Sequence, residues 1–355
     1  MGRYSRFWPA VSHCGCDGDE FPPPVAAVRQ SVGRAQGARS TGVTASPGRW
    51  RPAVGLALAA GLACGPARSA PATSLYVDCR GAPTTAPTVI LEAGAFGASA
   101  DWDLVLDDLA KGGRVCAYDR AGVGRSPPRA GGEDVVAIAD ELSGLLDALG
   151  ETRPVILVGH SNGALYIETF AALWPGRVAG LVYVNGVGSD DLDDPRLMAE
   201  LAKERRLSDL AVAAAHLGLT RLMASAVVQY VGLHGTAAAR KQQDLTRIAG
   251  LRTARDEDRA IIAGLALTRA LGGSPPEVPT VAIIGAVQPD APAAKAWRAA
   301  EAAPARRASA SWILDTPGAT HVSFLARDRA YVTAAVDWLR SLPRADAVQA
   351  PQPGR

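Results

Sequence analysis

Apolar residues occur in two kinds of run along most of this chain. From residue 75 onward, short uninterrupted apolar runs, typical of buried strands, are separated by longer segments in which apolar residues recur three and four positions apart, as on one face of a helix. The runs predicted to be strands are 75–79, 88–91, 115–118, 155–158, 181–184, 281–284 and 311–314. The helical spacing covers 102–110, 135–149, 164–174 and 330–342.

This alternation predicts the fold class. Strands that alternate with helices form a mostly parallel α/β sheet with helices on both faces. Between 191 and 273 every segment has helical character and none has strand character, which indicates an all-helical insertion that caps one edge of the sheet. We therefore expect an α/β core from residues 75–190 and 278–343, with a helical cap from residues 191–277.

The front of the chain has a different composition. Residues 1–52 are rich in Pro, Gly, Ser and Arg and show neither periodicity, so we expect them to be unstructured or absent from the mature protein. Near the end of this stretch, Arg49 and Arg51 precede a short apolar run and small residues, a succession typical of a secretory signal, which we assign to residues 53–72. At the other end, residues 344–355 are predicted to form a polar tail.

The signal segment predicts export and leaves two final locations open. The residues that end at Cys64 resemble an imperfect lipobox, the motif that places a lipid on the cysteine of an exported lipoprotein, with Gly61 where a larger aliphatic residue is usual. A lipid on Cys64 would anchor the protein to a membrane surface. The alternative is cleavage near Ala70 or Ala72, followed by free secretion.

Composition and charge exclude several classes of function. Lys plus Arg total 37 and Asp plus Glu total 35, so a net charge of +2 gives no electrostatic reason to expect a nucleic-acid partner. No apolar run reaches the roughly 18 residues that a membrane-spanning helix needs. The five cysteines include no CxxC pair, which argues against a zinc site. Basic residues of the helical insertion, such as Arg240 and Lys241, are spaced like solvated helix faces.

Two cysteines, Cys79 and Cys116, lie in the predicted core. Cys79 ends one predicted strand and Cys116 lies inside another. Since an exported protein meets an oxidising compartment, we expect the two to form a disulfide bond. A bridge that closes a loop of this length stabilises a fold by roughly 3–4 kcal/mol. Two buried free thiols are the alternative.

The strongest chemical motif is Gly-His-Ser-Asn-Gly at 159–163, directly between a predicted buried strand and a predicted helix. In this context G-x-S-x-G forms a nucleophile elbow, a turn so tight that the residues around the serine must lack side chains. Gly159 and Gly163 meet that need. Ser161 then projects at the carboxyl edge of the sheet, above a helix N-terminus that favours negative charge. We predict Ser161 to be a nucleophile; an ordinary glycine-rich turn is the alternative.

A serine hydroxyl needs a base that takes its proton, and the histidines narrow the choice. The chain has five histidines, namely His13, His160, His216, His234 and His321. His321 follows the last predicted strand, in a loop at the same edge of the sheet as Ser161, so we predict that it is the base. His160 lies inside the elbow, and His216 and His234 lie in the predicted cap, where we expect structural roles.

With these residues identified, the chain from about 75 to 342 resembles the α/β-hydrolases, in particular exported serine esterases and lipases with a helical cap. The segments that carry the resemblance are 89–94, 118–126, 159–163 and 318–321. The resemblance implies a triad in the chain order Ser, Asp or Glu, His, and neither a cofactor nor a metal. It also implies an oxyanion hole formed by the backbone N–H groups of Ala95 and Asn162.

The acid of the triad is the open position. The resemblance implies an acid after the strand that ends at Ile284, often three residues after a glycine, but Gln288 occupies that place. Asp290, two residues further on, is our first candidate. Some hydrolases take the acid from the loop after the preceding strand, where Asp190 and Asp191 lie. For these aspartates, capping of the first cap helix is the competing expectation.

Together these residues predict an exported serine hydrolase that cleaves a carboxylic ester, or a related acyl bond, through an acyl-enzyme. The expected partner is a small-molecule ester. Two alternatives share the triad: a cofactor-free perhydrolase of the haloperoxidase kind, and an amidase or peptidase. A third is of another class, a non-catalytic ligand-binding protein on the same fold.

Overall fold

The computed structural model describes residues 75–285 and 292–343. All of them belong to one compact unit, residues 66–355. The predicted signal segment, the sequence before it and the predicted tail lie outside the described residues. Cys64, Gln288 and Asp290 lie outside them too, so the predictions made for these positions stay predictions.

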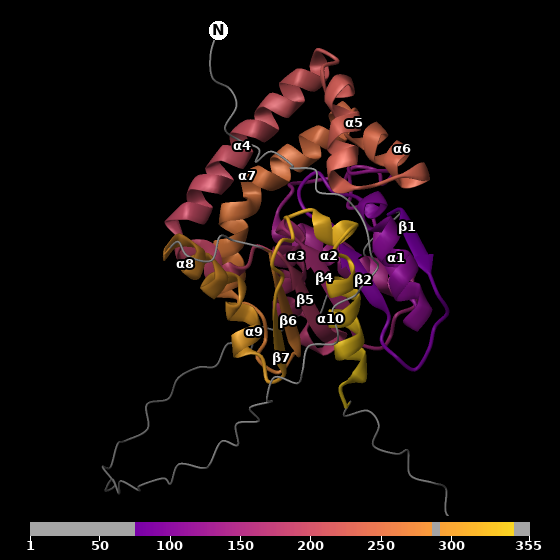
Figure 1. Ribbon diagram of the computed structural model, residues 1–355, viewed down its shortest axis with the longest axis vertical. Helices are drawn as coiled ribbons and strands as arrows, with labels where there is room; N and C mark the ends of the chain where they lie inside the picture. The colour runs from indigo at the N-terminus through magenta and orange to yellow at the C-terminus, as the bar shows by residue number, and fades with distance from the viewer. Residues whose placement is uncertain (1–74, 286–291, 344–355) are drawn as a thin grey trace, which may run out of the picture. The chain divides into compact units, whose positions relative to one another are not determined.

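A seven-stranded sheet forms the centre of the described part of the chain (Figure 1). Its strands are β1 (Val77–Arg80), β2 (Val89–Glu92), β3 (Val115–Tyr118), β4 (Val155–His160), β5 (Val178–Val184), β6 (Thr280–Ile284) and β7 (Ser311–Asp315). Their spatial order is β1-β3-β2-β4-β5-β6-β7. Within this sheet β1 pairs antiparallel with β3 and every other pair is parallel, which confirms the predicted fold class.

The central strands are apolar throughout because helices cover both faces of the sheet. These helices are α1 (Asp103–Leu109), α2 (Val135–Ala148), α3 (Asn162–Leu173) and α10 (Ala330–Ser341). On β2, Val89 and Leu91 pack into one apolar cluster with residues of α1 and α10. The residue between them, Ile90, packs into a second cluster with residues of α2 and α3. The sheet therefore has a core on each side.

The edge strand β1 is joined to β3 by a disulfide bond between Cys79 and Cys116. The two residues lie directly opposite each other in the antiparallel pair, and their Cα atoms are 4.0 Å apart. The predicted bridge is confirmed. It fixes the antiparallel strand to the parallel part of the sheet.

The connection between β5 and β6 consists of helices, as the sequence predicts. They are the short 3-10 helix η4 (Ser189–Asp193) and the α-helices α4 (Pro195–His216), α5 (Thr220–Val231), α6 (Gly235–Asp244) and α7 (Ile248–Ala270). Figure 1 shows α4 to α7 together at one end of the sheet. Asp194 caps the first long helix, because its carboxylate accepts a hydrogen bond from the backbone N–H of Arg196 at 2.9 Å.

Lys241, on α6, differs from the sequence-based expectation of a solvated helix face. Its side chain is buried, and Nζ donates to Oδ2 of Asp101 and to the carbonyl oxygen of Phe96, both at 2.8 Å. Asp101 belongs to the 3-10 helix η1 (Ser99–Trp102) of the core. A buried ammonium group needs such partners. The prediction was wrong for Lys241 because helical spacing does not show which face of a cap helix meets the core.

Between β6 and β7, the described residues form two helices that the sequence analysis did not predict. They are α8 (Pro292–Glu301) and α9 (Ala303–Arg307). In addition, the predicted helix 102–110 is divided among η1, α1 and the 3-10 helix η2 (Ala110–Gly112). None of the helices in the described ranges combines the length and the apolar character that crossing a membrane requires.

Candidate active site

The turn between β4 and α3 holds Ser161 in a rare backbone conformation, with φ 54° and ψ −127°. Residues other than glycine adopt a positive φ only where the surrounding structure enforces it. A Cβ atom on Gly159 would lie 2.5 Å from the carbonyl oxygen of Gly163. A Cβ atom on Gly163 would lie 2.5 Å from the carbonyl oxygen of Glu92. Both positions therefore require glycine, and the tight strand–helix turn that the motif predicts is present.

Ser161 and His321 line the same pocket, which has a volume of about 310 Å³. Its other lining residues are Asn162, Asn185, Val187, Leu197, Glu200, Leu201, Glu204, Gly285, Trp297 and Ala319. Helix α4 contributes four of these, so the helical insertion forms a wall of the pocket. The side chains of Ser161 and His321 are not hydrogen-bonded to each other in this structure. Among the described residues, no group of three or more His, Cys, Asp or Glu side chains could hold a metal ion.

The imidazole of His321 contacts a residue that the sequence analysis did not single out. Its Nδ1 lies 2.7 Å from Oδ1 of Asn185. Asn185 directly follows β5 and has a φ of 43°, a conformation that asparagine tolerates better than most residues. Its Nδ2 donates to Oε1 of Glu301, the last residue of α8, at 2.6 Å. A polar residue at the carboxyl end of a predicted strand was the available sequence signal for Asn185.

His160 holds the backbone of the His321 loop. Its Nε2 donates to the carbonyl oxygen of His321 at 2.7 Å, and the two ring centres are 4.7 Å apart. Burial lowers the pKa of His160 to about 4. The side chain of His321 is exposed at the pocket, and desolvation by the surrounding protein atoms, with the neighbouring His160, lowers its pKa to about 3. Both rings are therefore neutral near pH 7, and His321 can accept a proton.

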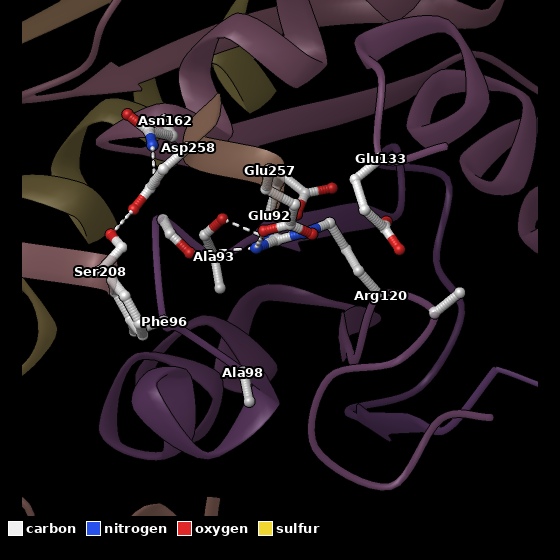
Figure 2. Close-up of polar contacts among 12 residues, drawn as sticks. Glu92, Ala93, Phe96, Ala98, Arg120, Glu133, Asn162, Ser208, Glu257 and Asp258 are labelled. Atoms are coloured by element: carbon white, nitrogen blue, oxygen red, sulfur yellow. Dashed lines mark hydrogen bonds and ion pairs between the residues drawn. The ribbon is translucent and has the colours of Figure 1, made fainter. Parts of the chain in front are cut away.

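The segments that carry the two predicted oxyanion donors lie beside Ser161. Asn162 is the first residue of α3 and is buried. Ala95 follows Gly94, and a Cβ atom on Gly94 would lie 2.8 Å from Cβ of Ser161. The side chain of Asn162 donates to Asp258 of α7 at 3.2 Å, as Figure 2 shows. This contact ties the start of α3 to a cap helix.

Arg120 forms a second buried link between the cap and this part of the site (Figure 2). Its guanidinium lies between Glu92 of β2 and Glu257 of α7, each 2.7 Å away. It also donates to the carbonyl oxygens of Ala93 and Gly94, at 2.6 and 3.1 Å. Burial raises the pKa of Glu92, and the positive charge of Arg120 opposes that rise. The guanidinium thus holds the backbone that leads to Ala95.

The aspartates considered as alternative acids are engaged elsewhere. Asp190 forms an ion pair with Arg307. Asp191 accepts a hydrogen bond from the backbone N–H of Gly188 at 2.7 Å, and burial raises its pKa to about 7. Both side chains therefore fix the start of the connection to the cap. Of the described residues, it is Asn185 that contacts Nδ1 of His321.

Comparisons with known proteins agree with this architecture. The family model described as "alpha/beta hydrolase fold" matches residues 87–229. An AB hydrolase superfamily protein of Gibberella zeae is 35% identical over 122 residues, which cover 31% of this chain and 36% of the relative. The bifunctional esterase/perhydrolase DCH of Acinetobacter calcoaceticus is 35% identical over 107 residues, 30% of this chain and 38% of the relative. The matched parts thus span less than two fifths of these relatives.

Solved structures extend the likeness of the fold beyond the range of that family model. A thermophilic esterase from Thermogutta terrifontis superposes with a TM-score of 0.54 at 22% identity. The match covers 76% of this chain and 96% of that chain. At this level of identity the likeness concerns the fold alone.

Proposed function

We propose that this chain is an α/β-hydrolase and acts as a serine hydrolase that cleaves a carboxylic ester or a related acyl bond. The observation that carries the proposal is the strained turn at Ser161, which opens into the same pocket as a neutral histidine, His321. A nucleophile on a strand–helix turn and a base on a loop after a later strand are the parts that acyl transfer requires.

In the proposed reaction, Ser161 attacks the acyl carbonyl while Nε2 of His321 takes its proton. The tetrahedral intermediate then develops negative charge on the carbonyl oxygen, which the backbone N–H groups of Ala95 and Asn162 stabilise. Each such donor contributes roughly 3 kcal/mol to the transition state. His321 returns the proton to the leaving group, and water hydrolyses the acyl-enzyme by the same steps in reverse order.

Perhydrolysis is the second candidate function. In that reaction hydrogen peroxide, in place of water, attacks the acyl-enzyme, so the same Ser161 and His321 would serve. The likeness to the bifunctional esterase/perhydrolase supports this candidate. Formation of a peracid from the ester in the presence of peroxide, measured through peroxide-dependent halogenation, distinguishes perhydrolysis from ester hydrolysis.

We also propose that the protein is exported, either secreted or anchored by a lipid on Cys64. The Cys79–Cys116 disulfide supports export, because such bonds persist in oxidising compartments and are rare in reducing ones. Mass spectrometry of the protein from cell envelope and culture medium would test this. A mature N-terminus at acylated Cys64 indicates an anchor, and one near Ala70 or Ala72 indicates secretion.

The first experiment is labelling of the purified protein with a fluorophosphonate probe, together with a panel of short-chain and long-chain esters and matching amides. We expect labelling and ester turnover in the wild type, and neither in Ser161→Ala or His321→Ala. Ser341→Ala, the same change on the exposed surface of α10, is the matched control and should retain both. A folded wild type without labelling and without ester or amide turnover would overturn the proposal.

A further inference from the structure

Two consecutive hydrogen bonds lead from the imidazole of His321 to a buried carboxylate. The first joins Nδ1 of His321 to Oδ1 of Asn185 at 2.7 Å. The second joins Nδ2 of Asn185 to Oε1 of Glu301 at 2.6 Å. The three residues come from different connections: Asn185 follows β5, Glu301 ends α8 after β6, and His321 follows β7.

The position of the Asn185 amide is fixed by its surroundings. Its backbone N–H donates to the carbonyl oxygen of Ile283 at 2.8 Å. A Cβ atom on Gly285 would lie 3.0 Å from Oδ1 of Asn185, so any larger residue at position 285 would crowd the amide. Asn185 is buried, has a left-handed φ of 43°, and contacts His321 in the loop after β7. Strain of this kind persists where the fold enforces it.

The hydrogen-bonding capacity of each group determines the tautomer of His321. The carboxylate of Glu301 accepts, so Asn185 turns its NH₂ group to Glu301 and its carbonyl oxygen to the ring. Nδ1 must then carry the proton and donate it to Asn185. Nε2 is left with a lone pair, which is the form that accepts the proton of Ser161.

We infer that Asn185 orients His321 for catalysis and that Glu301 supplies, through the Asn185 amide, the negative charge that a directly bound triad acid would supply. This inference rests on the proposed serine hydrolase function. A carboxylate that accepts from the NH₂ group polarises the amide, and the carbonyl oxygen of Asn185 becomes a stronger acceptor for the imidazolium that forms in the reaction.

Glu301 is buried beside the Asn185 amide. The residue is 4% exposed, and charges interact more strongly where water is excluded. Its Oε1 accepts the hydrogen bond from Asn185, and the side chain of Trp297 also hydrogen-bonds to the carboxyl group. Burial and, after it, the neighbouring Asp191 raise the pKa of Glu301 well above its usual range and so favour the neutral acid, whereas the hydrogen bonds from Asn185 and Trp297 favour the carboxylate. Glu301 and Asn185 thus stabilise each other.

The test compares ester kcat and KM, and the rate of fluorophosphonate labelling, in matched variants. We expect Asn185→Leu to lower kcat about 100-fold or more, because an orienting partner of a catalytic histidine contributes up to about 10⁴-fold. Glu301→Gln keeps the shape and removes the charge, and should lower kcat about 10-fold. KM should stay within about threefold in both, since the orientation matters in the transition state.

A matched control is Glu151→Gln, the same chemical change at the opposite edge of the sheet. Glu151 accepts from Thr88 Oγ1 at 3.0 Å and pairs with Arg114, just before β4 begins. This variant should keep the wild-type kcat. Thermal unfolding of every variant shows whether the change in rate occurs in folded protein, and the isosteric Glu301→Gln remains informative if Asn185→Leu does not fold.

A rescue experiment separates charge from packing. The double variant Asn185→Asp/Glu301→Gln transfers the negative charge from position 301 to position 185, next to His321, and leaves the shapes of both side chains almost unchanged. We expect it to recover most of the kcat that Glu301→Gln loses. A failure to recover it, with normal folding, would show that Glu301 acts only in packing and would overturn the inference.

Asp290, the acid predicted from the sequence, is the competing candidate. Loss of about 100-fold in kcat in Asp290→Asn, with wild-type kcat in Asn185→Leu and Glu301→Gln, would assign the role to Asp290 and overturn the inference. Failure of the proposed function is a distinct result, because the wild type itself would then neither be labelled nor turn over esters. Labelling that depends on Ser161 but not on Asn185 or Glu301 would overturn the inference alone.

Discussion

Three residues other than glycine adopt a positive φ in the described ranges: Phe96, Ser161 and Asn185. Each belongs to a different part of the candidate site. Ser161 is the proposed nucleophile, Asn185 contacts the proposed base, and Phe96 follows Ala95, the proposed oxyanion donor. Because strained backbone persists only where the surroundings enforce it, this distribution marks the site independently of the sequence motif.

The elbow glycines give the first prediction at this scale. Gly159→Ala or Gly163→Ala places a methyl group 2.5 Å from a backbone carbonyl oxygen, so we expect each to lower the free energy of unfolding by about 2–3 kcal/mol and to reduce labelling of Ser161. Urea unfolding measures the first effect. Gly176→Ala is the control, because nothing lies within 4 Å of its Cβ position. Equal stability of all three variants would contradict the steric argument.

His160 gives a prediction of pH dependence. Burial lowers its pKa to about 4 in the folded protein, whereas the unfolded chain binds a proton near pH 6.5. The contribution of the neutral ring to the free energy of unfolding is therefore complete above pH 6.5. It decreases by roughly 2–3 kcal/mol as the pH falls toward 4, because the unfolded chain then binds a proton that the folded protein does not. His160→Gln should show a shallower loss of stability between pH 6.5 and 4 in urea titrations. A loss as steep as in the wild type would assign the acid sensitivity to other groups.

At the scale of elements, the cap is hydrogen-bonded to the segments that form the site. Helix α7 presents two consecutive acidic residues to the core, Glu257 to Arg120 and Asp258 to Asn162. Helix α6 places Lys241 on Asp101 and on the carbonyl oxygen of Phe96. These two helices therefore support the backbone on both sides of Ala95, directly through Lys241 and indirectly through the pairing of Glu257 with Arg120.

Arg120 carries the prediction at this scale. Arg120→Met leaves Glu92 and Glu257 buried without a counter-ion, so we expect it to lower the free energy of unfolding by about 3–5 kcal/mol. The triple variant with Glu92→Gln and Glu257→Gln removes the unpaired charges and should recover much of that stability. It should not recover kcat, because the carbonyl oxygens of Ala93 and Gly94 remain without Arg120.

The control for that series is Arg259→Met on the same helix as Glu257. Arg259 pairs with Asp209 in an exposed position, and such pairs contribute roughly 0–1 kcal/mol. Denaturant unfolding and ester kinetics measure all the variants. Full recovery of kcat in the triple variant would show that Arg120 does not hold the oxyanion loop.

At the scale of the whole described unit, the parallel sheet brings distant parts of the sequence together. The carboxyl ends of β4, β5 and β7 supply Ser161, Asn185 and His321, and the loop after β2 supplies Ala95. Because parallel strands end at one edge of the sheet, residues in four separate connections meet there. The disulfide joins the edge strand β1 to its neighbour β3, at one end of the strand order, and lies outside the candidate site.

This separation predicts independent effects on stability and on activity. Removal of the bridge in Cys79→Ser/Cys116→Ser should lower the free energy of unfolding by roughly 2–4 kcal/mol, because the cross-link restricts the unfolded chain. The kcat at 25 °C should stay close to that of the wild type. Unfolding with and without a reducing agent measures the first effect. A wild type whose stability does not respond to reduction would contradict the assigned bridge.

Much of the fold and part of the site followed from local sequence signals. The apolar runs predicted the strands, because a strand buried on both faces is apolar throughout. The cysteines on two of these strands predicted the bridge. Ser161 and His321 each follow a predicted strand, and the rule that parallel strands end at one edge places them in one region. The pocket they share agrees with that expectation.

The remaining contacts of the site were decided by the tertiary structure. Asn185 and Glu301 are separated by more than a hundred residues, and the pairing of Arg120 with Glu257 spans an even longer separation. Lys241 has the spacing of a solvated position and is buried. A polar residue on a helix carries no local sign of whether its face meets water or another element, because packing between distant elements decides that. The sequence thus determined the succession of strands along the chain and predicted the proposed pair, Ser161 and His321, because these signals are local. Tertiary packing decided which groups contact that pair, because those contacts join distant parts of the chain.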